Sequence, residues 1–95
     1  MVADYSLIAS LLSQASAAHA VYERTTLKGV RDKAWPDWYA AYLVEHGVAD
    51  LINYAVTAAQ LSRLLAEYDR EYTHQKPGED WPNYYARRIA AIFGR

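Results

Sequence analysis

Two stretches of the sequence decide the fold: WPDWYAAYLVEHG at residues 35–47 and WPNYYARRIAAIFG at residues 81–94. Each begins with a Trp-Pro pair, and proline is favoured at the first helical position because the N–H that it lacks would have no partner there. Apolar and aromatic side chains then recur at helical spacing. Gly47 and Gly94 follow, and glycine often ends a helix in a left-handed conformation. Each stretch is therefore predicted to form a short helix.

The two stretches belong to a longer internal repeat. A gapless shift of 46 positions aligns thirteen identical pairs of residues. The identical pairs within the quoted stretches are Trp35/Trp81, Pro36/Pro82, Tyr39/Tyr85 and Ala40/Ala86. A Trp-Pro pair that matches another in the same frame is hard to reach by chance, even in an alanine-rich helical sequence. We therefore expect a tandem duplication of one unit, with the first copy at residues 1–46 and the second at 47–92.

A long amphipathic helix is expected before each short one. Apolar residues recur at spacings of three and four over residues 5–22, and the same spacing recurs over 51–68. Asp4 and Asp50 stand where a residue that caps the helix N-terminus belongs. The predicted helices span about 4–24, 36–46, 50–73 and 82–93, joined by polar loops at about 25–34 and 74–80.

These elements predict the fold class and the number of domains. No segment alternates in the manner of a β-strand. Only Gly47-Val48-Ala49 separates the second predicted helix from the third, which is too little for a flexible linker. We therefore expect an all-α, four-helix single domain over residues 1–95, built from two helical hairpins with pseudo-twofold symmetry.

Composition excludes several classes of function. The net charge is −1, from ten Lys and Arg against eleven Asp and Glu, so no basic surplus favours nucleic acid or a membrane surface. The absence of cysteine excludes a disulfide framework, a thiolate zinc site and a cysteine nucleophile. No apolar run approaches the ~18 residues of a membrane span, and the N-terminus lacks a positively charged signal-peptide region. The expected location is the cytoplasm.

A motif distinguishes the first half of the chain. His19-x-x-Tyr22-Glu23 is followed by Trp-Pro-Asp-Trp-Tyr-Ala-Ala-Tyr at residues 35–42. This pattern resembles small bacterial helical domains of unassigned activity, which occur alone and beside glyoxalase/bleomycin-resistance-like domains. The resemblance covers about residues 19–46 and implies no particular reaction.

The second half departs from the motif. Leu65, Asp69 and Tyr84 stand at the positions of His19, Glu23 and Trp38. If the chain has a site, the first half is therefore the better candidate.

Two functional hypotheses follow. The leading one is a non-catalytic helical module that acts through protein contacts as a homodimer. It contains no complete catalytic, metal-binding or cofactor-binding motif, and nine Tyr and three Trp exceed what one small core is expected to bury. The alternative is a domain, enzymatic or not, that binds a small molecule or a metal. The candidate ligand-binding residues of this alternative are His19, Tyr22, Glu23, Trp38 and Tyr39.

His19 and Glu23 illustrate the choice between the two hypotheses. Four residues apart, they share one helix face and could hold a metal or act as an acid/base pair. The structural interpretation is favoured because His19 lies on the apolar stripe and its repeat partner is Leu65. On that interpretation His19→Leu leaves stability unchanged or raises it slightly.

Overall fold

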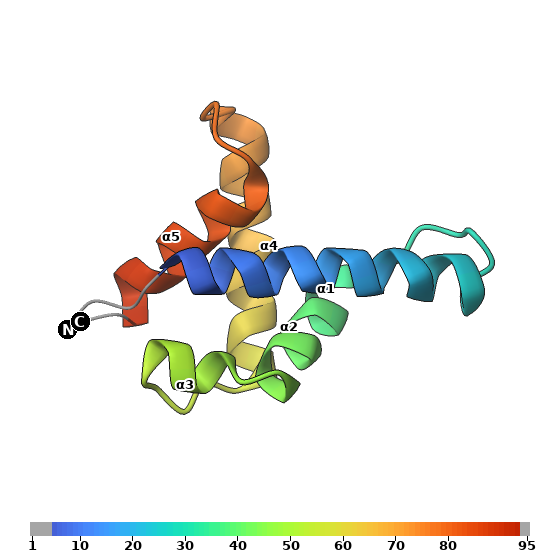
Figure 1. Ribbon diagram of the computed structural model, residues 1–95. Helices are drawn as coiled ribbons and strands as arrows, with labels where there is room; N and C mark the ends of the chain where they lie inside the picture. Colours follow the sequence, from blue (N-terminus) through green and yellow to red (C-terminus); the bar gives the residue numbers. More distant parts are fainter. Residues whose placement is uncertain (1–4, 94–95) are drawn as a thin grey trace.

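A computed structural model describes residues 5–93, and within them the chain forms five α-helices and no strand. The helices, labelled in Figure 1, are α1 (Tyr5–Thr25), α2 (Trp35–Glu45), α3 (Val48–Ile52), α4 (Ala58–Gln75) and α5 (Trp81–Phe93). The all-α prediction is confirmed. None of the described helices has the length and apolarity needed to cross a membrane. The predicted caps Asp4 and Gly94 lie outside the described residues.

The prediction of one continuous helix over about 50–73 is wrong. After α3, Asn53 adopts a left-handed backbone conformation with φ of 51°, which asparagine tolerates better than most residues. The chain then runs without regular structure to Thr57, and α4 begins at Ala58. A short helix and a turn therefore replace the first part of the predicted long helix.

The cap of the long second-half helix is also not where the sequence placed it. Asp50 lies inside α3, whereas Thr57 caps α4. The Gln60 N–H donates to the Thr57 hydroxyl at 3.1 Å, and the Thr57 N–H donates to the Gln60 side chain at 2.9 Å. This reciprocal pair is a capping box. Gly47 has a φ of 93° between α2 and α3, the left-handed conformation predicted for it.

The helices α2 and α5 each pack mainly against the long helix of the other half of the chain. The most extensive contacts join α2 to α4 and α1 to α5, and both exceed the contacts within either hairpin, α1 with α2 or α4 with α5. In the view of Figure 1 the two long helices cross, with α5 beside α1. The two halves therefore share one core.

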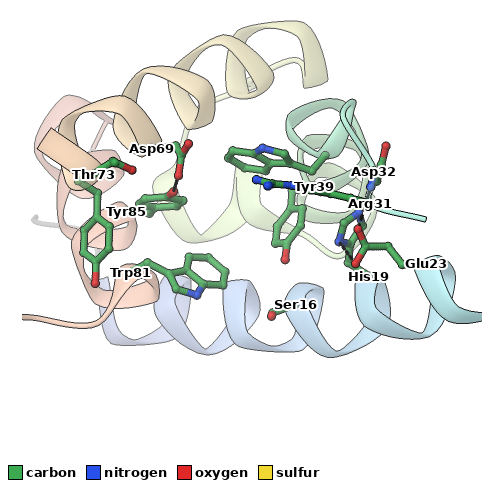
Figure 2. Close-up of a pocket in the computed structure, with 12 residues that line it drawn as sticks. Ser16, His19, Glu23, Arg31, Asp32, Tyr39, Asp69, Thr73, Trp81 and Tyr85 are labelled. Carbon is green, nitrogen blue, oxygen red and sulfur yellow. Dashed lines mark hydrogen bonds and ion pairs between the residues drawn. The ribbon is translucent and has the colours of Figure 1, made fainter. Parts of the chain in front are cut away.

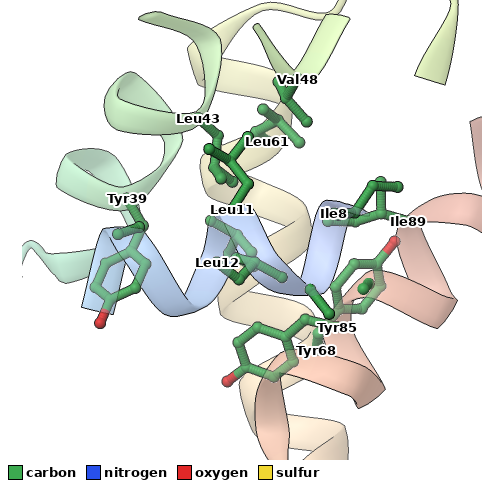
Figure 3. Close-up of a cluster of buried hydrophobic side chains, with 14 of the residues drawn as sticks. Ile8, Leu11, Leu12, Tyr39, Leu43, Val48, Leu61, Tyr68, Tyr85 and Ile89 are labelled. Carbon is green, nitrogen blue, oxygen red and sulfur yellow. The ribbon is translucent and has the colours of Figure 1, made fainter. Parts of the chain in front are cut away.

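The core is filled by aliphatic and tyrosine side chains from all five helices (Figure 3). The largest fully buried side chains are Tyr68, Ile8, Leu12, Leu43, Ile52, Leu61, Leu65, Ile89 and Val48. Each of the aliphatic side chains among them contributes roughly 1.5–3 kcal/mol relative to an exposed position. The predicted stripe over residues 5–22 is buried from Ile8 to His19.

The aromatic side chains are mostly packed within the chain. Of the nine Tyr and three Trp, all of them within residues 5–93, only Tyr5 and Tyr54 are exposed. Tyr5 begins α1, and Tyr54 lies in the break between α3 and α4. Of the other ten rings, four are buried in the core and six are only partly buried; the four are Tyr39, Tyr68, Tyr84 and Tyr85.

Candidate functional site

A pocket of about 420 Å³ opens between the two halves of the chain (Figure 2). α1, α2, α4, α5 and the loop between α1 and α2 all contribute to its wall. Its aromatic lining residues are Trp35, Tyr39, Tyr72, Trp81 and Tyr85. Its charged or titratable lining residues, apart from the tyrosines, are His19, Glu23, Arg31, Asp32 and Asp69.

A hydrogen-bonded cluster of His19, Asp32 and Glu23 forms one end of the pocket. The His19 Nε2 atom is 2.9 Å from a carboxylate oxygen of Asp32, and its Nδ1 atom is 3.9 Å from one of Glu23. Glu23 accepts a hydrogen bond from the Asp32 backbone N–H at 2.9 Å, and the Asp32 side chain accepts one from the Ala34 N–H at 2.9 Å. These contacts fix the loop over residues 26–34 against α1.

His19 is also enclosed by aromatic rings. Its ring centroid lies 4.9 Å from those of Trp38 and Tyr39, and 6.0 Å from that of Tyr22. The histidine is only 6% exposed. It therefore combines a core position with a polar edge that faces two carboxylates.

Three of the five predicted site residues line the pocket: His19, Glu23 and Tyr39. Tyr22 and Trp38 do not line it, but they pack on the His19 ring. The structure brings all five together around His19 and divides them between the pocket wall and the layer that supports it.

Asp69 and Tyr85 lie toward the other end of the pocket (Figure 2). The Tyr85 hydroxyl donates a hydrogen bond to Asp69 at 3.1 Å. Burial, reinforced by the Asp69 charge, raises the pKa of Tyr85. The phenol therefore stays protonated at neutral pH and keeps its role as a donor.

Tyr39 is a second buried phenol in the wall. Burial raises its pKa, the nearby charge of Glu23 adds to this effect, and a hydrogen bond with Ser16 opposes it. Like Tyr85, Tyr39 therefore presents a neutral hydroxyl to the pocket.

The sequence analysis did not predict the contribution of the second half to this site. The internal repeat could have predicted this contribution, because several lining residues stand 46 positions apart in identical or conservative pairs. These pairs are Glu23/Asp69, Trp35/Trp81 and Tyr39/Tyr85. Arg31 and Asp32 were missed because they lie in a loop, where no periodic pattern marks the residues that turn inward.

The lining carries an excess of negative charge. Among the described residues that form it, there are three carboxylates, Glu23, Asp32 and Asp69, and one permanent positive charge, on Arg31. Nowhere in residues 5–93 do three His, Cys, Asp or Glu side chains form a group that could hold a metal ion. The metal-binding form of the alternative hypothesis thus has no ligand set in this part of the chain.

Comparison with known proteins found no matching family model, no matching curated protein and no matching solved structure.

Proposed function

We propose that this protein binds a small organic cation, of the amine class, in the pocket between its two halves. One observation carries the proposal: three carboxylates and five aromatic rings line a single pocket that holds one permanent positive charge. Carboxylates attract a cation directly, and the faces of aromatic rings attract it through their quadrupoles, by about 0.5–2 kcal/mol for each close contact. Neutral or anionic ligands would gain neither interaction.

The hydrogen bonds within the pocket leave carboxylate charge available to a ligand. Asp69 accepts from a neutral phenol, and no described basic side chain lies within salt-bridge distance of it. Glu23 accepts from a backbone N–H, and its one basic neighbour in the described residues is His19 at 3.9 Å. An ammonium group that enters the pocket would therefore meet incompletely compensated negative charge.

Arg31 already places a positive charge in this pocket. Its side chain extends from the loop into the pocket (Figure 2), and it forms no salt bridge with another described residue. The chain itself thus directs a guanidinium group into this acidic and aromatic environment. A ligand amine would bind beside this charge and be repelled by it.

Calorimetric titration tests the proposal directly. Propylamine, tetramethylammonium and 1,4-diaminobutane should bind, whereas propionate and propanol should not. At a concentration of 100 times its Kd, a bound amine should raise the free energy of unfolding by about 2.7 kcal/mol. If no amine releases or absorbs heat at millimolar concentration, the proposal is wrong.

Matched variants place the binding in the pocket. Asp69→Asn removes one pocket charge and should weaken amine binding several-fold, while Asp50→Asn removes an exposed charge on α3 and should not. Arg31→Ala should tighten binding because it removes a competing cation. Its control is Arg63→Ala, at an exposed position of α4 that does not line the pocket.

A second candidate function is the protein-interaction module, acting as a homodimer or with another protein. It is favoured by exposed apolar surface where the segment between α3 and α4 meets the end of α5: Tyr54 is 49% exposed and Ile92 is 42% exposed. The Tyr54 ring lies 5.0 Å from that of Phe93. Only two of the twelve Tyr and Trp rings are exposed, so this candidate depends on the Tyr54–α5 patch, defined as Tyr54, Ile92 and Phe93.

We also infer that the two halves arose by duplication and that the protein acts in the cytoplasm. The duplication is supported by two features: α2 and α5 both begin at their tryptophan, 46 residues apart, and each packs on the long helix of the other half. The full copies at residues 1–46 and 47–92 are not equivalent throughout, because α1 has no counterpart of the break between α3 and α4. Residues 12–45 should still superpose on 58–91 by a rotation near 180°, and a crystal structure would test this. Two different hairpin geometries would contradict it.

A further inference from the structure

We infer that the ligand is a linear diamine or polyamine, held by one ammonium group at each end of the pocket. This inference depends on the proposed function, because it specifies which organic cation the pocket takes. It starts from the placement of Glu23 and Asp69 in the pocket.

The carboxylates of Glu23 and Asp69 lie toward opposite ends of the pocket. In Figure 2, Glu23 lies with His19 and Asp32 at the end formed by α1 and the loop, while Asp69 lies near Thr73 on α4. A ligand with a single cation can satisfy one end only. A ligand with a cation at each end satisfies both.

Aromatic side chains occupy the space between the two ends. Tyr39 and Trp81 lie there in Figure 2, with their ring centroids 5.9 Å apart and their planes at 72°. Trp35 packs edge-on against Tyr39, and Tyr85 packs against Trp81. These rings offer an apolar wall against which a methylene chain can pack. The sequence of carboxylate, rings and carboxylate matches the sequence of ammonium, methylenes and ammonium.

The repeat gives this arrangement a simple origin. Glu23 and Asp69 stand 46 residues apart in the two copies, as do Tyr39 and Tyr85. Equivalent residues from two copies that face one pocket give it two similar ends. A ligand with two similar, positively charged ends would complement the shape and the charge pattern of such a pocket.

The two ends are not identical. At the first, His19 and backbone N–H groups already engage Glu23 and Asp32. At the second, the Tyr85 hydroxyl donates to one oxygen of Asp69 and leaves the carboxylate charge without a described basic partner. We therefore expect Asp69 to be the stronger of the two ammonium sites.

A chain-length series tests the inference on the unmodified protein. Calorimetric titration would compare diamines with two to eight methylenes between their ammonium groups against n-alkylamines of the same length. The affinity of the diamines should pass through a maximum, where the diamine binds at least tenfold more tightly than its monoamine. Equal affinities, or no dependence on length beyond that of the monoamines, would overturn the inference but leave amine binding intact. If neither series binds, the proposed function itself fails.

Isosteric variants then assign the two ends. Glu23→Gln and Asp69→Asn should each reduce the affinity of the best diamine toward that of its monoamine. Glu67→Gln, at an exposed position of α4 that does not line the pocket, is the matched control and should change little. If only one pocket variant weakens the diamine, binding is single-ended and the inference is wrong. Thermal melts of each variant would verify that it is folded.

Discussion

Among the individual residues, His19 has a buried ring whose polar edge faces the carboxylates of Asp32 and Glu23. The repeat pairs it with Leu65, so the pattern favours an apolar core position, and the position is indeed buried. The pattern could not reveal Asp32, whose carboxylate lies 2.9 Å from the His19 ring. That contact depends on the path of a loop, and residue spacing carries no information about such a path.

His19→Leu is now expected to destabilise the protein, contrary to the expectation from the sequence alone. The Asp32 side chain is only 12% exposed, and without the histidine it loses a hydrogen-bond partner at a site with little access to water. We expect the free energy of unfolding, measured by urea denaturation, to fall by about 1–3 kcal/mol. His19→Asn retains a donor and should recover part of the loss. Unchanged stability in His19→Leu would restore the simpler view of a packing residue.

At the scale of the element, helix ends were predictable where the sequence contains a strong local signal. The Trp-Pro pairs and the glycine after α2 fixed both short helices to within a residue or two. The break before α4 was missed because apolar spacing continues through Tyr54 and Asp50 offered a plausible cap. Thr57-x-x-Gln60 was the competing signal, and the structure shows that it forms the cap.

Thr57→Ala tests how strongly this capping box defines α4. The change removes the acceptor for the Gln60 N–H, and it should lower the free energy of unfolding by about 1 kcal/mol. Thr25→Ala is a suitable control, since the Thr25 hydroxyl donates to the Val21 carbonyl within α1 and caps no N-terminus. Chemical denaturation of both variants makes the comparison. Equal losses in the two would show that the cap has no special role.

For the molecule as a whole, the sequence predicted the all-α class but not how the two halves of the chain associate. Periodicity identifies the apolar face of each helix, but it does not specify which helix covers that face. The packing of α1 on α5 and of α2 on α4 determines that residues from both halves meet at one pocket. For that reason, the motif in residues 19–46 could not predict the lining residues that the second half contributes.

The interaction-module candidate makes its prediction at this scale. If the Tyr54–α5 patch is an interface, light scattering at micromolar concentration should report a dimer, and Ile92→Lys should convert it to a monomer. A charge at Ile92, which is already 42% exposed, should have little effect on folding, so circular dichroism should be unchanged. A monomer at high concentration would remove the homodimer form of this candidate and leave the proposal of cation binding unaffected.

The packing of α2 and α5 on the long helices of the opposite halves also bears on how such a chain could evolve. A lone hairpin would leave uncovered the face of its long helix that the other half now buries, and a second copy of itself would be its natural cover. In such a pair, every mutation would appear twice, once on each side of the shared pocket. Joining two copies in one chain frees each side to change alone. If the two halves arose by duplication as proposed, the differences between His19 and Leu65 and between Arg31 and Pro77 are changes that a symmetric ancestor could not have tried one at a time.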